Sequence, residues 1–105
     1  MRKIAIVSLI AATLFTHTTI ADQMLAMRSG CLGCHKMDAK LVGPAFQDVA
    51  TKYAGEAGAI DRLADKVKAG STPGEPLVWG NVAMPPSQAK LDDIQGVINW
   101  VMTLK

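Results

Sequence analysis

The hydrophobic positions in the second half of the chain repeat with the period of an α-helix in three separate stretches. These stretches are Phe46, Val49, Ala50 and Tyr53; Ile60, Leu63, Ala64 and Val67; and Ile94, Val97, Ile98, Val101 and Met102. Each set covers one face of a helix. Gly55 and Gly70 follow the first two sets and predict where those helices end. Asp92 and Asp93 precede the third set, where acidic side chains complement the helix dipole.

A shorter helix is predicted before residue 31, with Asp22 as its N-cap. Met24 and Met27 lie on it at i, i+3 spacing, and we interpret them as core or surface residues. Gly96 interrupts the last helix at a cost of up to about 1 kcal/mol relative to alanine. A close crossing of the first and last helices would explain this glycine. We expect Trp100 to pack at that crossing or against the edge of a bound group.

The N-terminus has the organisation of an export signal. Two basic residues, an apolar run over 4–15 and a small residue at Ala21 follow one another. This order predicts a secretory signal peptide over 1–21 and an exported, periplasmic domain over 22–105. An uncleaved membrane anchor is the alternative, but the run is shorter than the about 20 residues that span a bilayer. We therefore expect no stable membrane insertion.

Charge excludes one class of partner. The chain of 105 residues carries 11 basic and 9 acidic residues, a net charge of +2. Removal of Arg2 and Lys3 with the signal peptide would leave a nearly neutral domain. The chain has neither a lysine cluster nor an acidic tail, so we expect no nucleic-acid partner. Docking to other proteins should depend on a local patch.

The chemistry is concentrated in Cys31, Cys34 and His35, which form a Cys-x-x-Cys-His motif. On one helical turn these positions share a face. Two thiols can then bond to the two vinyl groups on one porphyrin edge, while the imidazole lies under the iron. Gly30 and Gly33 allow the backbone to approach the ring closely. The motif predicts one haem c, attached through two thioethers.

Other interpretations of the two cysteines are a redox-active dithiol, half of a zinc site or a disulfide. A tetrahedral zinc site needs four ligands, and the only other candidates are His35 and His17, the latter in the predicted signal peptide. A thioredoxin-like dithiol is typical of a βαβ setting, which the helical pattern does not provide. The export signal favours haem attachment.

The segment 71–87 contains four prolines and has an apolar centre, Leu77-Val78-Trp79-Gly80. A loop of this length in a small domain is usually functional or disordered. We interpret it as a loop wrapped over the cofactor. Met84 precedes two prolines that stiffen the chain, and a thioether is a soft ligand that suits haem iron. Met84 is therefore the predicted sixth ligand.

The segment Lys40-Leu41-Val42-Gly43-Pro44 is predicted to form a loop after the haem motif. The Pro44 carbonyl could accept a hydrogen bond from the imidazole nitrogen of His35 that does not face the iron, which would orient the ring. A plain turn explains the Gly-Pro sequence equally well.

Taken in order, these motifs resemble the small bacterial class I cytochromes c, and more closely the single-haem periplasmic carriers of denitrifying and other respiratory chains. The resemblance implies an all-α fold of about four short helices wrapped around one covalently bound haem. It implies His35 and Met84 as axial ligands and the Pro44 carbonyl as the partner of His35. By the same resemblance, Lys66 and Trp79 bond the haem propionates. Ser87 stands where relatives often place an amide near the ligand sulfur, and the segment 72–77 is longer than the usual family loop.

With both axial positions filled by protein, the expected function is electron transfer by a monomeric carrier that is not an enzyme. The resemblance implies a quinol-oxidising complex or another donor upstream, and a terminal oxidase or nitrite reductase downstream. The predicted docking patch comprises Val42, Val82 and Ala83 with lysines at its rim. A ligand-binding haem sensor or enzyme is the alternative function, and a cofactor-free dithiol oxidoreductase is a further one.

Overall fold

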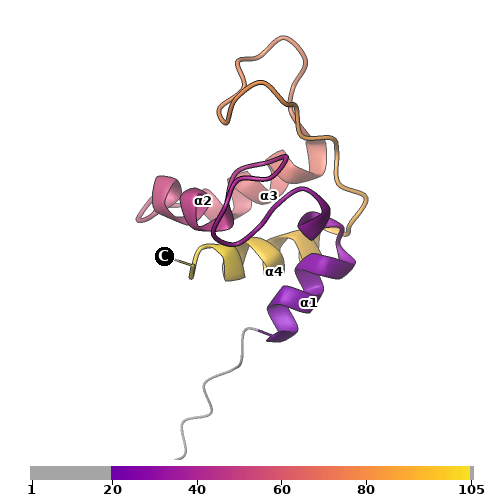
Figure 1. Cartoon of the computed structure of the whole chain (residues 1–105), viewed down its shortest axis with the longest axis vertical. Coiled ribbons are helices and arrows are strands. Elements are labelled where there is room, and N and C mark those ends of the chain that lie inside the picture. The colour runs from indigo at the N-terminus through magenta and orange to yellow at the C-terminus, as the bar shows by residue number, and fades with distance from the viewer. Residues whose placement is uncertain (1–19, 105) are drawn as a thin grey trace, which may run out of the picture.

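The computed structural model describes residues 20–104, which form four α-helices and one 3-10 turn and contain no strand (Figure 1). The elements are α1 (Ile20–Arg28), η1 (Cys31–Gly33), α2 (Phe46–Tyr53), α3 (Ala59–Ala69) and α4 (Leu91–Val101). The predicted all-α fold is confirmed, and the last three helices contain the three apolar stretches almost completely. Among the described residues, no helix is both long and apolar enough to cross a membrane. Most of the predicted signal peptide lies outside the described residues.

The first helix begins earlier than predicted. Because α1 starts at Ile20, Asp22 lies inside its first turn and the prediction of Asp22 as N-cap is wrong. An acidic side chain in the first turn still complements the helix dipole. Met24 and Met27 are exposed, so they are surface residues and not core residues.

The crossing of α1 and α4 is confirmed. A methyl group on Gly96 would lie 3.1 Å from Leu25 Cδ2, so the glycine permits the close approach of the two helices. The buried cluster at this crossing consists of Ala26, Phe46, Val97, Trp100 and Val101. Trp100 is 3% exposed within it, which places the indole at the crossing.

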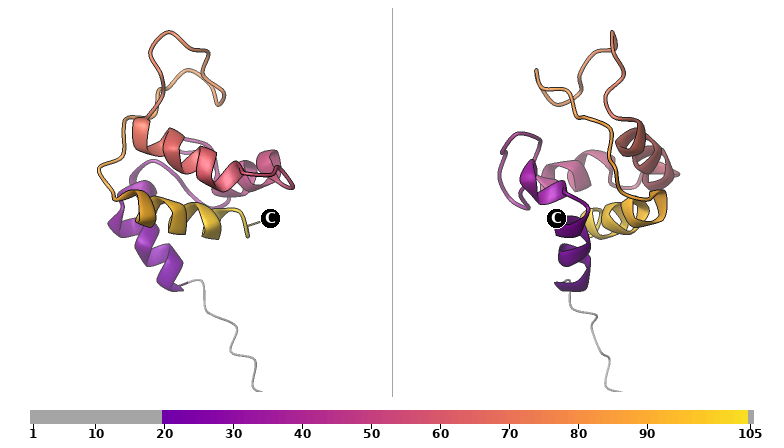
Figure 2. Two further views of the ribbon diagram at one scale, coloured as in Figure 1. Left: turned by 180° about the vertical axis from the view of Figure 1, so that it is seen from behind. Right: turned by 90° about the vertical axis from the view of Figure 1, so that its right-hand side faces the viewer.

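A second buried cluster joins α3 to α4 and consists of Ala59, Leu63, Ala64, Ile94 and Ile98. The two helices therefore present their predicted apolar faces to each other. The views in Figure 2 show α3 and α4 running alongside each other. The loop between them leaves the helical body and returns to it at the start of α4 (Figure 1).

Candidate functional site

A cavity of about 230 Å³ lies between the helices and the loop that follows α3. All seven predicted site residues line it: Cys31, Cys34, His35, Pro44, Lys66, Trp79 and Met84. The remaining lining is mainly apolar and comes from α2, α3, α4 and the loop. The fold thus brings the Cys-x-x-Cys-His motif and the methionine loop, about fifty residues apart, to one cavity.

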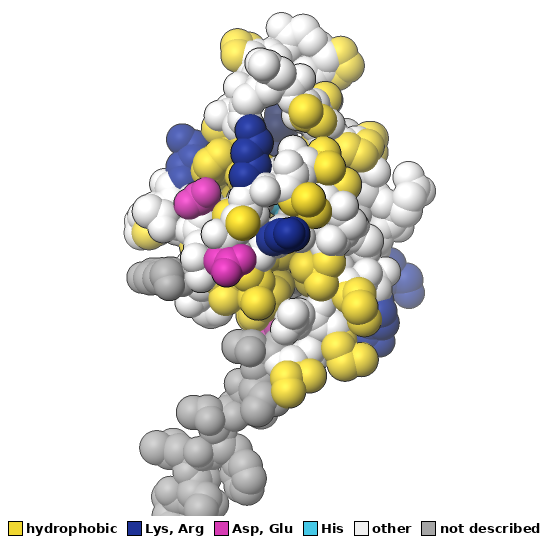
Figure 3. Space-filling view, viewed as in Figure 1, with side chains coloured by type: hydrophobic (Ala, Val, Ile, Leu, Met, Phe, Trp, Pro, Cys, Tyr) yellow, Lys and Arg dark blue, Asp and Glu magenta, His cyan; other side chains and the backbone are white. Residues whose placement is uncertain are grey.

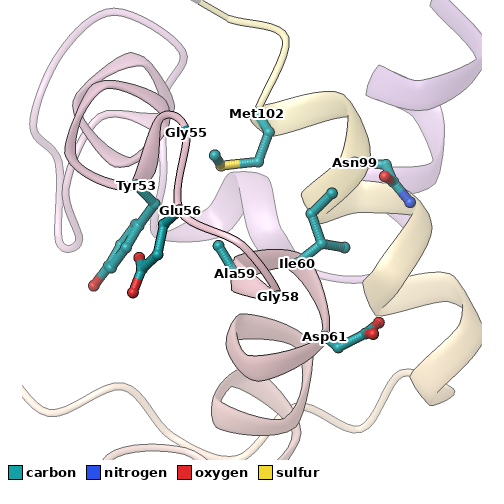
Figure 4. Close-up of a pocket in the computed structure, with 9 residues that line it drawn as sticks. All are labelled: Tyr53, Gly55, Glu56, Gly58, Ala59, Ile60, Asp61, Asn99 and Met102. Carbon is teal, nitrogen blue, oxygen red and sulfur yellow. The ribbon is translucent and has the colours of Figure 1, made fainter.

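A second, open pocket of about 540 Å³ lies at the α2–α3 turn (Figure 4). Its lining includes Tyr53, Glu56 and Asp61, together with Asn99 of α4 and Met102, which directly follows that helix. None of the predicted site residues lines this pocket. This pocket is therefore not the site that the sequence predicts.

The cysteine motif forms a tight turn. The backbone N–H groups of Cys34 and His35 both donate to the Cys31 carbonyl, at 3.2 and 3.0 Å. The predicted helical turn is thus a short one: η1 covers Cys31–Gly33, and Cys34 and His35 directly follow it. Gly30 precedes it with φ of 80°, a left-handed conformation that favours glycine.

The surroundings of Cys31 do not activate its thiol. Burial raises the pKa of the Cys31 thiol. A backbone hydrogen bond lowers the pKa by a smaller amount, and the neighbouring Cys34 raises it by the smallest. Catalytic dithiols need a lowered pKa so that one sulfur is a thiolate near neutral pH. The dithiol oxidoreductase alternative is therefore not favoured.

The His35 imidazole is oriented by the loop that follows the motif. His35 Nδ1 lies 2.8 Å from the Pro44 carbonyl oxygen, which can only accept a hydrogen bond. The Nδ1–H must therefore donate, and Nε2 is left as the nitrogen with a free lone pair. This tautomer can bind a metal through Nε2.

Met84 is held by a residue that the sequence did not single out. The Ser71 N–H donates to the Met84 carbonyl at 2.8 Å, and the Met84 N–H donates to Ser71 Oγ at 2.9 Å. A methyl group on Gly70 would lie only 2.7 Å from Pro86 N and 2.9 Å from the Met84 carbonyl. Gly70 was predicted only as a helix end, but it also allows the methionine segment to lie against α3.

Ser87 has backbone partners. Its N–H donates to the Val67 carbonyl at 3.1 Å, and its Oγ accepts from the Ala89 N–H at 3.2 Å. The hydroxyl therefore stabilises the turn that leads into α4.

Lys66 and Trp79 line the cavity, and each has a charged side chain close to it. Lys66 Nζ is 3.7 Å from the Glu75 carboxylate, and both side chains are about half exposed. Lys52 Nζ lies 5.8 Å from the centre of the Trp79 ring. Glu75 comes from the long loop and adds a carboxylate to the cavity wall that the sequence did not predict.

The donor set fits a covalently attached haem. Two thiols and a free imidazole nitrogen stand on one turn, a thioether lines the same cavity, and the surrounding wall is apolar. Apolar walls with a few fixed ligands are typical of haem sites, in which thiols attach the ring and histidine and methionine bind the iron.

Comparisons with known proteins agree with this chemistry. A family model described as cytochrome c matches residues 20–105. The chain is 41% identical to cytochrome c-551 of Pseudomonas aeruginosa over 108 aligned residues, which cover 100% of both chains. It is 38% identical to cytochrome c-552 of Hydrogenobacter thermophilus over 105 residues, again covering 100% of both.

The fold is also similar to a solved structure. Wild-type cytochrome c552 of Nitrosomonas europaea superposes with a TM-score of 0.72 at 39% sequence identity. The match covers 79% of this chain and 99% of that one.

Proposed function

Because this chain belongs to the cytochrome c family, we propose that His35 and Met84 ligate its haem, and that it carries single electrons between respiratory proteins of the periplasm. The chain is an electron carrier with one covalently attached haem c, not an enzyme. The observation that supports the ligand assignment is the meeting of Cys31, Cys34, His35 and Met84 at one cavity.

Haem supplies a one-electron iron couple, and the protein determines how that couple is used. Cys31 and Cys34 fix the ring covalently, so the carrier cannot lose it between partners. His35 and Met84 would together hold the iron, which would leave it no free position for oxygen, peroxide or substrate. Methionine as a ligand raises the reduction potential. These roles favour electron transfer over a ligand-binding sensor.

The surface around the cavity fits brief contacts with other redox proteins. Val42 and Val82 are 49% and 63% exposed, and Ala83 is exposed beside them. Figure 3 shows apolar side chains gathered on one face with basic side chains among them. Interfaces of electron carriers are small, below about 1,200 Å². The proposed partners are a quinol-oxidising donor and a terminal oxidase or nitrite reductase as acceptor.

Export is part of the proposal. Haem would be attached to a domain over 22–105 after removal of residues 1–21, as the order of basic, apolar and small residues indicates. N-terminal sequencing of the periplasmic protein would test this, and a mature chain that does not begin at Asp22 would contradict it.

Absorption spectra of the exported protein test the ligand assignment. The wild-type ferric protein should show a near-infrared band from sulfur bound to iron, and Met84→Ala should lose it. Met24→Ala is the matched control, because Met24 is exposed on α1 and does not line the cavity. A band that survives in Met84→Ala would assign the sixth ligand elsewhere, and a colourless protein would remove the haem assignment.

A further inference from the structure

We infer that Phe46 is a positioning residue for the His35 imidazole, and that its aromatic face tunes the reduction potential of the ligated iron. The inference rests on the proposed function in one respect, the ligation of iron by His35. The sequence predicted Phe46 only as part of the apolar face of a helix.

The two rings are stacked. Their centroids are 5.0 Å apart and their planes differ by 17°. A parallel ring at this distance blocks the swing of the imidazole toward that side, which the hydrogen bond from Nδ1 to Pro44 would not prevent by itself. The Pro44 carbonyl fixes one atom of the imidazole, and Phe46 restricts the orientation of the ring plane.

Backbone hydrogen bonds hold Phe46 to the segment that carries His35. The Phe46 N–H donates to the Lys36 carbonyl at 2.9 Å, and the Gly43 N–H donates to the Cys34 carbonyl at 2.8 Å. The two acceptors are the residues immediately before and after His35. The segment 43–46 therefore attaches to the chain on both sides of the ligand.

Gly43 restricts the imidazole at another point. A methyl group there would lie 2.9 Å from His35 Nδ1 and 3.0 Å from Nε2, and closer still to Cε1. The backbone of Gly43 is thus in contact with the end of the ring between its two nitrogens. Together, Gly43, Pro44 and Phe46 restrain the imidazole at its Cε1 end, at Nδ1 and on one face.

Phe46 cannot easily move away from His35. It is 6% exposed, and its ring meets Trp100 edge to face at 5.8 Å with an interplanar angle of 79°. Trp100 is itself fixed in the α1–α4 crossing. Close-packed interiors transmit such constraints, so the helical core supports one face of the ligand.

The stack also has an electrostatic consequence. The face of a phenyl ring carries partial negative charge, and an imidazole bound to iron becomes more positive when the iron is oxidised. Phe46 should therefore stabilise the oxidised protein relative to the reduced one. Loss of the aromatic face should raise the reduction potential. The redox equilibrium should change by up to about fivefold, the lower end of the range for a cation over an aromatic ring, because only part of the added charge lies on the imidazole.

The test compares Phe46→Leu with Phe46→Tyr in the holoprotein. Phe46→Leu should raise the potential and change the pattern of haem-methyl shifts in the proton NMR spectrum of the oxidised protein, because these shifts report the orientation of the axial imidazole. Phe46→Tyr retains the ring and should retain both properties. Leu25→Ala is the control for general destabilisation, because Leu25 packs against the same cluster without lining the cavity, and it should leave both unchanged.

A fluorinated phenylalanine provides a version of the test that does not change the shape of the core. Phe46 is the only phenylalanine in residues 22–105, so biosynthetic replacement labels this position alone in the exported domain. Fluorination weakens the negative face and should raise the potential while leaving the methyl-shift pattern intact.

The outcomes separate this inference from the proposed function. An unchanged potential in the fluorinated protein, with the near-infrared sulfur band present, would overturn the electrostatic part. An unchanged methyl-shift pattern in Phe46→Leu would overturn the positioning part. Absence of histidine ligation in the wild-type protein would instead overturn the proposed function.

Discussion

Replacement of Gly43 by alanine tests how closely the loop fits His35. Gly43 does not have positive φ, so alanine is compatible with its backbone and any cost must come from contacts. The new methyl group would lie 2.9 Å from Nδ1 and 3.0 Å from Nε2, whereas ordinary carbon contacts begin near about 3.5 Å. Because the methyl group would lie closer still to Cε1, either the imidazole or the loop must move by about an ångström to restore ordinary contacts.

The size of the expected destabilisation follows from the contacts that this movement disturbs. Overpacking a well-packed site costs about 1–3 kcal/mol, and weakening the His35–Pro44 hydrogen bond adds up to about 1 kcal/mol. Alanine also restricts the unfolded chain, and this offsets about 0.4–1 kcal/mol of the lost stability. We therefore expect Gly43→Ala to lower the free energy of unfolding of the holoprotein by about 1–3 kcal/mol.

Guanidinium unfolding of the ferric holoprotein, followed by tryptophan fluorescence, measures this difference. Gly96→Ala is the matched control, because its methyl group would meet only the flexible Leu25 side chain at 3.1 Å and would gain helix propensity of up to about 1 kcal/mol. It should therefore be close to neutral. Equal stabilities of Gly43→Ala and the wild type, with an unchanged spectrum, would refute the argument that the loop is closely fitted to the ring.

Three further predictions concern the loop that carries the methionine. Gly70→Ala should lose at least about 2 kcal/mol in guanidinium unfolding, because Gly70 has φ of 75° and its methyl group would lie 2.7 Å from Pro86 N; wild-type stability would contradict the placement of the loop. Ser71→Ala removes the acceptor of the Met84 N–H at 2.9 Å and should cost about 1 kcal/mol and weaken the near-infrared sulfur band, whereas Ser71→Thr should retain it. Glu75→Gln should change the unfolding free energy by less than about 1 kcal/mol, because its lysine partner is 3.7 Å away and half exposed; a larger loss would show that the pair is more important than its exposure indicates.

The helices could be predicted because their signals are local. Apolar spacing predicts α2, α3 and α4, and the glycine in α4 predicts the crossing with α1. The start of α1 could not be predicted in the same way. Asp22 has the chemistry of an N-cap, but in the full chain Ile20 and Ala21 precede it in helical conformation, and this places Asp22 in the first turn.

The site was predictable where its residues have distinctive chemistry. Thiols at fixed spacing with an adjacent histidine, and a methionine before two prolines, can be recognised without a structure. Ser71 could not, because its importance depends on pairing with a residue 13 positions away. Phe46 could not either, because apolar spacing identifies a buried ring but not the ring against which it stacks.

The residues that support the two proposed ligands come from different parts of the chain, which explains why the sequence predicts one support better than the other. His35 is supported by residues 43–46, within eleven positions, so a loop after the motif could suggest the role of Pro44. Met84 is supported by Gly70 and Ser71, which approach it only because α3 ends where it does and the long loop returns. No local sequence pattern identifies a residue that supports Met84 across such a loop. The length of the loop and the path of its backbone decide which residue lies beside Met84.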